Sequence, residues 1–327
     1  MKVAISRTYG PPEVVEIEEI EKPVPAENEI LIKIMTSPVT QVDAIFRSGS
    51  QFLARLFTGL LKPRFNVLGS EFAGEVVEIG SEVTNYKAGD HVIGCSEEKM
   101  GTHAEYLTLP EKWSMIRKPD GLTDIDAVAA MHGAITATPF LREGAKLQPG
   151  QSILINGASG AIGAIGVQQA KLLGAHVTGV CSGANVELVK SLGADEVIDY
   201  TVEDFSTRDE AYDVIFDTIG KSSYWKGRSS LKPGGVYLTT APKITFLFTW
   251  LYSMAFSSKK GKAVFAGMRT PEQKVTDMTF TYDLMAAGKI KAVIDQTWPL
   301  DKIVEAHRLV DTGHKKGSVV LIVGDNN

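Results

Sequence analysis

The chain has 327 residues, of which 44% are apolar and 22% charged, and this composition predicts a soluble globular protein of about two domains. Its formal net charge is −5 and it has no basic run or interleaved aromatic stripe, so nucleic acid is not expected as a partner. Two cysteines exclude a four-cysteine zinc site, and with an N-terminus that lacks signal-peptide features they favour a cytoplasmic protein.

Residues 1 to about 120 are predicted to form short strands separated by proline and glycine. The segments "EILIKIMTSPV" and "FAGEVVEIG" alternate and carry β-branched residues, and "KAGDHVIG" has a turn followed by a strand. We expect this all-β segment to form a closed or partly closed barrel. The stretch "QFLARLFTGLLKP", at 51–63, predicts a short helix that lines a substrate channel or touches a membrane surface.

From Gln151 onward, strands and helices alternate. Helical spacing marks "AIGAIGVQQAKLLG", which ends at Gly174, and "NVELVKSLG". Six strands are predicted, at "QSILING", "HVTGVCS", "EVIDY", "YDVIFDTIG", "GVYLTT" and "KAVFAG". This alternation predicts an α/β fold, a doubly wound parallel sheet covered by helices on both faces. The last segment, "DQTWPLDKIVEAHRLVDTGHKKGSVVLIV", predicts a strand, a helix and a final strand that returns to the first domain.

The stretch "LINGASGAIG" places Gly157, Gly160 and Gly163 after a predicted strand and at the start of a predicted helix. A tight turn needs a residue that tolerates positive φ, a pyrophosphate needs a missing side chain, and close helix–strand packing needs the last glycine. The helix N-terminus then presents free N–H groups to the phosphates. In this strand–helix–strand setting the motif predicts a dinucleotide site.

The end of the second strand indicates which dinucleotide is bound. NAD sites usually carry an acid there, which holds the ribose 2′-hydroxyl. Here Ser182 takes that position, and the next carboxylate along the chain is Glu187. We therefore expect NADPH, with its 2′-phosphate held by Ser182, Asn185 and Lys190. A solvated helix face is the alternative interpretation of Lys190.

Ten segments together resemble the medium-chain dehydrogenase/reductases, most closely the zinc-free, quinone oxidoreductase-like branch that includes NADP-dependent alcohol dehydrogenase-like proteins. They are "YGPPEVV", "VDAIFRSG", "LGSEFAGEVVEIG", "KAGDHVIG", "AEYLTLP", "LINGASGAIG", "SLGADEVIDY", "YDVIFDTIG", "LKPGGVYL" and "GHKKGSVVL". The resemblance implies a GroES-like barrel domain at 1–124 joined by 288–327, and a Rossmann domain at 125–287, with the cofactor in the cleft between them. It also implies a homodimer, paired through a Rossmann edge strand supplied here by "KAVFAGM".

The resemblance assigns further cofactor contacts to matching positions. It implies that Thr136 and the loops Thr239, Thr240, Ala241, Pro242 and Phe265, Ala266, Gly267 line the nicotinamide, that Ser159, Gly160, Ala161 and Ile162 hold the pyrophosphate, that Ser182 and Tyr200 contact the adenosine end, and that Lys316 approaches the phosphate.

The chain departs from its zinc-using relatives at the metal ligands. Thr40 stands where they have a cysteine, Ser70 stands where they have the histidine of "GHE", and His132 aligns with the later cysteine. Neither a threonine nor a serine hydroxyl is a usual zinc ligand. We therefore predict that no metal is bound. The quinone oxidoreductase branch often has asparagine at the Thr40 position, so no catalytic role is copied from there.

Without a metal, hydride transfer favours an acceptor that spreads the developing charge. A quinone or an enone does so over a conjugated system and then needs one hydrogen bond and one proton. Thr40, Ser70 and His132 are the candidate sources, and a structural histidine in the hinge is the alternative for His132. We therefore expect an NADPH-dependent reductase of a small apolar quinone, enone or activated carbonyl. The alternative is an NADPH-binding sensor, scaffold or structural protein with little turnover.

The longest apolar run, "ITFLFTWLYSMAF" at 244–256, is too short to span a bilayer, so no stable membrane insertion is expected. It predicts a helix that is buried against the sheet or across a dimer interface. The alternative is an aromatic lid over an apolar substrate channel.

Overall fold

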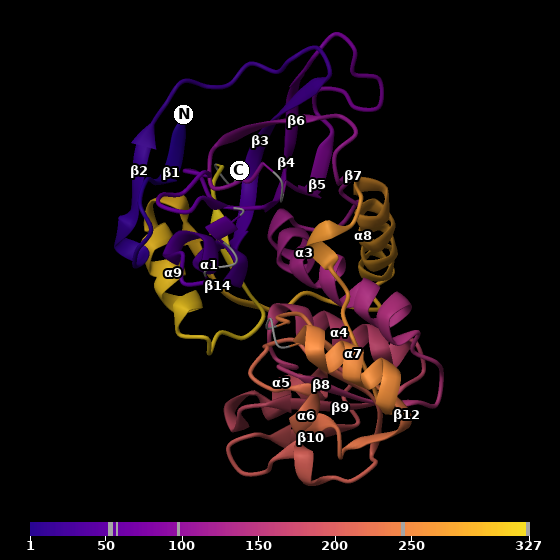
Figure 1. Cartoon of the computed structure of the whole chain (residues 1–327). Coiled ribbons are helices and arrows are strands. Elements are labelled where there is room, and N and C mark those ends of the chain that lie inside the picture. The colour runs from indigo at the N-terminus through magenta and orange to yellow at the C-terminus, as the bar shows by residue number, and fades with distance from the viewer. Residues whose placement is uncertain (52–54, 57, 97–98, 243–245, 325–327) are drawn as a thin grey trace. The chain divides into compact units, whose positions relative to one another are not determined.

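A computed structural model describes residues 1–51, 55–56, 58–96, 99–242 and 246–324 (Figure 1). Its internal contacts divide the chain into two units. We call Met1–His132 with Thr270–Asn327 the barrel unit, and Gly133–Arg269 the Rossmann unit. Among the described residues, no helix is both long and apolar enough to cross a membrane.

The barrel unit is built mainly from antiparallel strands. In its described part, one sheet has the strand order β14-β15-β3-β4-β5-β7, β6 also pairs with β3, and β1 and β2 form a separate antiparallel pair. The predicted β-rich first domain is therefore confirmed. The strands are β1 (Lys2–Ser6), β2 (Val15–Glu19), β3 (Glu29–Val39), β4 (Glu71–Ile79), β5 (His91–Cys95), β6 (Tyr106–Pro110), β7 (Met115–Arg117), β14 (Ile294–Pro299) and β15 (Ser318–Ile322).

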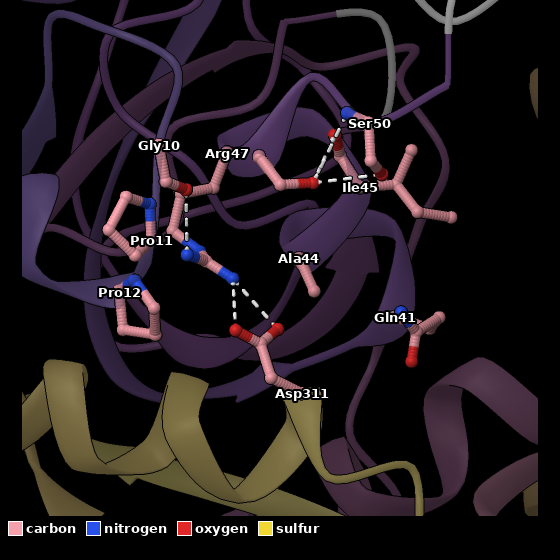
Figure 2. Close-up of a pocket in the computed structure, with 10 residues that line it drawn as sticks. Gly10, Pro11, Pro12, Gln41, Ala44, Ile45, Arg47, Ser50 and Asp311 are labelled. Atoms are coloured by element: carbon pink, nitrogen blue, oxygen red, sulfur yellow. Dashed lines mark hydrogen bonds and ion pairs between the residues drawn. The ribbon is translucent and has the colours of Figure 1, made fainter.

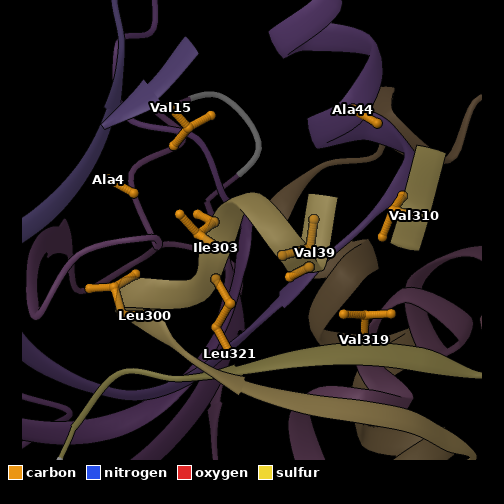
Figure 3. Packing of buried hydrophobic residues seen from close by; sticks show 10 residues of the cluster. Ala4, Val15, Val39, Ala44, Leu300, Ile303, Val310, Val319 and Leu321 are labelled. Atoms are coloured by element: carbon orange, nitrogen blue, oxygen red, sulfur yellow. The ribbon is translucent and has the colours of Figure 1, made fainter. Parts of the chain in front are cut away.

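The C-terminal segment returns to the barrel, as the sequence predicts. Strand β15 pairs antiparallel with β3, with Val319 opposite Val39. The apolar face of helix α9 (Ile303–Asp311) packs with these strands in a core that also includes Ala4 and Val15 from the start of the chain (Figure 3). A single apolar core therefore joins the two ends of the sequence.

The expectation of an all-β first segment was wrong at one place, because helix α1 (Gln41–Ser48) follows β3. Thr40 and Asp43 form a capping box at its start, and Gly49 ends it in the left-handed region at φ +58°. Its Arg47 is buried and donates two hydrogen bonds to Asp311 of α9 (Figure 2). Of the predicted helix at 51–63, residues 52–54 and 57 lie outside the described residues, and Arg55, Leu56 and Thr58 are helical.

The Rossmann unit has a parallel sheet. Within its described residues the strand order is β10-β9-β8-β11-β12-β13, which is the 3-2-1-4-5-6 order of two mononucleotide-binding halves. The predicted doubly wound sheet is confirmed. The strands are β8 (Ser152–Asn156), β9 (His176–Cys181), β10 (Glu196–Asp199), β11 (Tyr212–Asp217), β12 (Leu231–Thr239) and β13 (Lys260–Lys262).

Helices α4 and α5 follow the first two strands, as the sequence predicts, and Gly174 has φ +81° just beyond α4. The α-helices of this unit are α4 (Ala161–Leu172), α5 (Val186–Ser191), α6 (Tyr224–Gly227) and α7 (Phe246–Phe256), while α3 (Asp124–Pro139) has residues in both units. Short 3-10 turns are η1 (Pro12–Val14), η3 (Gly183–Asn185), η4 (Phe205–Thr207), η5 (Ala266–Met268) and η6 (Leu300–Lys302), and a π-helical turn, η2 (Phe140–Ala145), continues α3.

The sixth strand is shorter than "KAVFAG" predicts. Strand β13 pairs with β12 only over Lys260–Lys262, and the chain then turns into η5. The edge strand is therefore Lys-Gly-Lys and not a run of β-branched residues, which removes the sequence argument for pairing through "KAVFAGM". The homodimer stays a prediction.

Helix α8 (Pro271–Ala286) belongs to the barrel unit, although the sequence-based limits of 125–287 assign it to the Rossmann domain. Its buried Tyr282 donates a 2.6 Å hydrogen bond to the main-chain oxygen of Ala127, and Met278 is buried beside it along the helix. This packing explains why the contacts place the second boundary before α8. The limits of the domains as folding units stay a prediction.

Candidate cofactor and active site

The glycine loop has the conformation that a pyrophosphate site requires. Gly157 leaves β8 at φ +85°, and Gly160 is the extended N-cap of α4 without a side-chain cap. A Cβ added to Gly163 would lie 2.1 Å from the Gly157 oxygen, whereas one added to Gly160 would meet only that oxygen, at 3.4 Å. Gly157 and Gly163 therefore serve the turn and the packing, and Gly160 leaves space at the first N–H groups of α4, from Ala161 and Ile162.

A buried carboxylate that sequence reasoning missed holds the neighbouring loop. Asp217, at the end of β11, accepts hydrogen bonds from Asn156 Nδ2 at 2.9 Å and Tyr237 Oη at 2.9 Å. It also accepts from the main-chain N–H groups of Ile219 and Gly220. An acid at the end of the apolar run "YDVIFD" was the available signal. Asp217 thereby joins the carboxyl ends of β8, β11 and β12, where open α/β sheets bind ligands.

The predicted nicotinamide loop Thr239–Pro242 lies at this same edge. Thr240 donates its N–H to the main-chain oxygen of Asp217 at 3.1 Å, and its hydroxyl to the main-chain oxygen of Thr218 at 3.1 Å. A Cβ added to Gly220 would lie 2.5 Å from Ala241 Cβ, so the loops after β11 and β12 pack closely. The second predicted loop, Phe265–Gly267, leads into η5, with the Phe265 side chain exposed.

Thr136 lies on the part of α3 that belongs to the Rossmann unit and is buried. One turn earlier, Gly133 allows α3 to approach α4, because an added Cβ would meet Ile165 at 2.5 Å and the Ala161 oxygen at 3.0 Å. Thr136 therefore follows the turn of α3 that packs against the start of α4.

The residues expected at the adenosine end come together around Asn185. Its Nδ2 donates to Ser182 Oγ at 3.2 Å and to Ser159 Oγ at 3.3 Å, which links the end of β9 to the glycine loop. Lys190 forms an exposed ion pair with Glu187 at 2.9 Å. Tyr200 follows β10 with half of its surface exposed.

Along the sequence the next carboxylate after Ser182 is Glu187, but in the structure the carboxylate of Asp199 lies beside the adjacent Gly183. Parallel pairing of β10 with β9 sets Asp199 opposite Cys181, and a Cβ added to Gly183 would lie 2.4 Å from Asp199 Oδ2. Hydrogen bonds from the Thr201 main chain and hydroxyl, and from the Gly183 main chain, hold the pKa of Asp199 below its usual value. Sequence distance hid this contact, which only the strand register creates.

In the barrel unit, Asp43 joins two loops that the sequence singled out. Its Oδ2 accepts the Thr40 hydroxyl at 2.7 Å and the Thr40 N–H at 2.8 Å. Its Oδ1 accepts the Gly69 N–H at 2.9 Å. The Thr40 hydroxyl proton is therefore committed to a buried carboxylate, and Ser70 follows directly after the bonded residue.

His132, which aligns with a zinc ligand of the relatives, forms a close acid–base pair with Glu71, the residue that follows Ser70. His132 Nδ1 lies 2.6 Å from Glu71 Oε1, with the histidine side chain 18% exposed and the glutamate 1% exposed. Ser37 Oγ holds the Glu71 main-chain oxygen at 2.8 Å. Thr40, Ser70 and His132 are thus connected through Asp43, Gly69 and Glu71 within one unit.

The C-terminal "HKKG" turn adds a lysine that the sequence did not single out. Lys315 Nζ donates to the Gly317 oxygen at 2.6 Å. Burial lowers the pKa of Lys315 to about 8, against the opposing effects of Asp295 and Glu71. The predicted phosphate contact, Lys316, is exposed and donates its main-chain N–H to Asp295 Oδ2 at 3.1 Å.

The remaining cysteines and histidines have structural environments. Cys95 and Cys181 are buried free thiols, and burial raises the pKa of Cys181 to about 11. His103 is buried with Nε2 3.1 Å from the Pro38 oxygen, and His91 is exposed on β5. In the described ranges, no group of three or more His, Cys, Asp or Glu side chains is arranged to hold a metal ion.

A cavity of about 340 Å³ lies elsewhere in the barrel unit (Figure 2). Its walls include Pro11, Pro12, Gln41, Arg47 and Asp311, and none of the predicted site residues lines it. The Arg47–Asp311 ion pair crosses it, so the cavity marks the packing of α1 against α9 and not the candidate active site.

The apolar run at 244–256 does form a helix, α7, although residues 244 and 245 lie outside the described range. Phe246 packs against the core of the sheet, but the expectation that the helix is buried there was wrong for the large side chains that follow it. Thr249 and Ser253 are the buried residues, whereas Phe248 and Phe256 are largely exposed. Helix propensity and apolar content predicted the helix, but not which side would face the sheet.

The fold and these two groups of residues define an oxidoreductase that binds a nicotinamide cofactor, with a GroES-like barrel and a Rossmann unit. Two family models match the chain, "Alcohol dehydrogenase GroES-like domain" over 26–120 and "Zinc-binding dehydrogenase" over 192–321. The second name describes the family and does not restore the missing ligand types at Thr40 and Ser70.

Similar proteins match this chain over most of its length. The chloroplast envelope quinone oxidoreductase homolog of Arabidopsis thaliana is 31% identical over 319 residues, covering 93% of each chain. The 2-methylene-furan-3-one reductase of Solanum lycopersicum is 33% identical over 338 residues, covering 98% of this chain and 79% of that one. The structure of the quinone oxidoreductase from Coxiella burnetii matches with a TM-score of 0.89 at 27% identity, covering 99% of each.

The chain belongs to the quinone oxidoreductase-like medium-chain dehydrogenase/reductases. The resemblance stated from the sequence motifs is confirmed. These relatives are named as oxidoreductases, so the chain is an enzyme of this family, and the alternative of a sensor or scaffold with little turnover is not favoured.

Proposed function

We propose that the protein is an NADPH-dependent reductase of small quinones and enones that uses no metal. The observation that carries the proposal is the close pair between the buried Glu71 and the partly exposed His132, which stands beside hydroxyl residues where zinc enzymes have ligands. The relatives named for quinone reduction and for reduction of a methylene furanone support both acceptor classes.

The Rossmann unit fits the nicotinamide dinucleotide at two places. Gly160 leaves open space at an uncapped helix start, which suits a pyrophosphate, and Ser159, Ser182 and Asn185 form a polar cluster that suits a ribose phosphate. Asp199 does not favour the phosphate, but three hydrogen bonds already occupy its carboxylate. Lys190 contributes by giving up its exposed ion pair with Glu187 and pairing with the 2′-phosphate instead. When bound, the cofactor supplies a hydride from its reduced nicotinamide.

The chain's own residues supply the proton that completes the reaction. A quinone takes one hydride and one proton to become a hydroquinone, and an enone takes the same pair across its C=C bond. His132, held by Glu71 at Nδ1, donates a proton or hydrogen bond from its other nitrogen to the acceptor oxygen. Solvent returns that proton, because the histidine is partly exposed.

Thr40 is a weaker candidate donor than the sequence suggested. Its hydroxyl proton is donated to Asp43, and its oxygen caps α1 by accepting the Asp43 N–H at 3.4 Å. We therefore assign Thr40 the role of fixing the loop that carries Gly69 and Ser70. Loss of such a cap costs about 1 kcal/mol of stability.

The central experiment measures NADPH oxidation by the purified protein with a panel of quinones and enones, and NADP⁺ reduction with simple secondary alcohols. We expect turnover with electron-poor quinones or enones and none measurable with the alcohols. Oxidation of alcohols at a comparable rate, or no turnover with any acceptor of the panel, contradicts the proposal.

Two variants separate the candidate donors. His132→Ala should lower kcat roughly 10²-fold, by analogy with the loss of one hydrogen bond to a developing oxyanion. Thr40→Ala should change kcat little and lower stability. His91→Ala is the matched control, because it removes an exposed histidine of the same unit. An unchanged kcat in His132→Ala assigns the proton to solvent and refutes the donor role.

We also propose that the protein is a cytoplasmic homodimer. The two free, buried cysteines suit a reducing compartment, and the short β13 strand leaves one edge of the Rossmann sheet available for pairing. Light scattering at micromolar concentration tests the assembly, and a monomer at that concentration would contradict it.

A further inference from the structure

Helix α7 is amphipathic in the reverse sense to a normal surface helix. Surface helices usually turn their large apolar side chains inward and their polar ones to water. In α7 the buried positions are Thr249 and Ser253, which are four residues apart and share one face. The opposite face carries Phe248, Leu251 and Met254, with exposed fractions of 72%, 52% and 58%.

Small hydroxyl residues on the inner face explain how the helix is held. Ser253 Oγ accepts the N–H of Gly261 on β13 at 3.0 Å and donates to the Trp250 oxygen at 3.0 Å. A Cβ added to Gly261 would lie 3.4 Å from Thr249 Cγ2 and 3.6 Å from Ser253 Oγ. The helix therefore lies close against a glycine of the edge strand, and this contact uses none of the large apolar side chains of the outer face.

The exposed apolar surface extends beyond α7. Trp225, which is 54% exposed, lies 4.9 Å from the ring of Tyr252, and Tyr252 lies 6.0 Å from the ring of Phe256. We call Phe248, Trp250, Leu251, Met254, Phe256 and Trp225 the aromatic face. An exposed, contiguous apolar patch of this kind marks a surface that another apolar phase covers.

The charge around the aromatic face indicates what covers it. Between Asp217 and Glu272 the sequence holds nine lysines and arginines and no acidic residue, whereas the remainder of the chain carries a net −14, since the whole is −5. Three lysines, Lys259, Lys260 and Lys262, follow α7 directly, and Lys260 Nζ donates to the Ser253 and Ser257 oxygens near the end of the helix.

Some of these cations have partners from outside the basic stretch. Ion pairs join Lys226 to Asp204, Lys232 to Asp213, Lys259 to Glu210 and Arg269 to Glu143. Lys262 Nζ donates to the Gly144 main-chain oxygen at 3.3 Å. These pairs reduce the local positive charge but place no acidic residue within α7 itself, whose described residues are all uncharged. An aromatic helix followed by lysines has the composition of an interfacial helix that lies in an anionic membrane surface.

We propose that α7 docks the protein on an anionic lipid surface, with the aromatic face in the headgroup and acyl boundary and the net positive charge of the stretch 218–271 attracted to the phosphates. This contact is peripheral, because α7 has 11 residues and is too short to span a bilayer. It does not depend on the proposed reductase activity, since it concerns only the outer face of α7 and its flanking charges.

Vesicle sedimentation tests the proposal with the full-length protein. The probes are vesicles of phosphatidylcholine mixed with phosphatidylglycerol, and vesicles of phosphatidylcholine alone. We expect the wild type to bind the anionic vesicles more tightly than the neutral ones, and added salt to weaken the anionic binding. Absence of wild-type binding to the anionic vesicles overturns the proposal, whatever the result of the activity assays.

Matched variants locate the contact. Leu251→Glu should weaken partitioning about tenfold or more, because the variant removes a half-exposed leucine that the lipid would cover and adds a negative charge that anionic lipid repels. Val24→Glu is the control, since Val24 is 80% exposed in the barrel unit and lies outside every segment assigned to a membrane or substrate contact, and it should bind as the wild type does. Both variants change exposed positions, and their circular dichroism spectra should match that of the wild type.

Three outcomes contradict the proposal. The first is that Leu251→Glu binds as tightly as the wild type, and the second is that Val24→Glu loses binding equally, which would make the contact unspecific. The third is that light scattering shows Leu251→Glu converting a dimer to a monomer while the wild-type protein binds neither kind of vesicle. The aromatic face would then be covered by a second copy of the chain.

Discussion

Replacement of Gly163 by alanine tests the packing role of the last glycine in the loop. The new Cβ would lie 2.1 Å from the Gly157 oxygen and 2.8 Å from the Ala158 Cα, and both neighbours are main-chain atoms that no side-chain rotation can move. Alanine in a helix is favoured over glycine by about 1 kcal/mol, whereas overpacking of this kind costs about 1–3 kcal/mol and more for a rigid neighbour. We therefore expect a net loss of about 2 kcal/mol of stability.

Gly160→Ala is the matched control within the same loop. Its Cβ would meet only the Gly157 oxygen, at 3.4 Å, and its φ of −80° suits any residue. Its stability should therefore stay within about 0.5 kcal/mol of the wild type. Its methyl group occupies the space in which we place the pyrophosphate, so its affinity for NADPH should fall clearly.

Urea denaturation measures the stability of both variants, and quenching or enhancement of fluorescence on titration with NADPH measures binding. We expect a crossed pattern, in which Gly163→Ala loses stability and Gly160→Ala loses affinity without losing stability. A Gly163→Ala variant as stable as the wild type would refute the packing argument. A Gly160→Ala variant with unchanged affinity would show that the phosphates bind elsewhere.

Three further predictions concern the cofactor, the metal and acid stability. The protein should bind NADPH more tightly than NADH, and Ser182→Asp should weaken NADPH binding by about 1–3 kcal/mol through like-charge repulsion; equal affinities of the wild type for the two cofactors contradict this. Protein purified without added metal should hold well under one zinc per chain by elemental analysis and keep its activity with a chelator, whereas stoichiometric zinc would show that the alignment of Thr40 and Ser70 is wrong. Burial, followed by the charges of His103 and Arg47, holds the pKa of His307 well below its usual value near 6.5, so as the pH falls through about 6.5 the unfolded chain binds a proton that the folded chain does not. Stability should therefore fall on acidification, His307→Leu should reduce that loss between about pH 7.5 and pH 5, and an unchanged pH dependence of urea unfolding would exclude His307 as its source.

The sequence by itself determined the two-domain architecture and the glycine loop. Strands and helices alternate from Gln151, and each is marked by a spacing of apolar residues that depends only on neighbouring positions. The strand, the glycines Gly157 and Gly163, and the helix also follow one another directly along the chain. The return of the C-terminal strand to the barrel was also predictable, since the apolar run at 318–322 needs a partner and follows a helix with one apolar face.

The sequence was misinterpreted, or left undecided, where one residue pattern fits two different structural roles. Thr40 and Asp43 are three residues apart, which is the spacing of a capping box, but Thr40 was interpreted from the sequence only as the position of a lost metal ligand and a candidate donor. The helix α1 was therefore missed. In α7 the sequence predicted a helix, but composition alone does not assign its faces when large apolar residues surround two small hydroxyl residues.

Only the tertiary structure decided which distant side chains meet. Strand register places Asp199 beside Gly183, and the packing of α3 on the barrel places His132 2.6 Å from Glu71, which lies 61 residues earlier. The Asp217 hydrogen bonds likewise depend on three strands ending at one edge of the sheet. Such contacts depend on the positions of whole elements, which no local window of sequence contains, and they decide where charge, hydrogen bonds and protons are available.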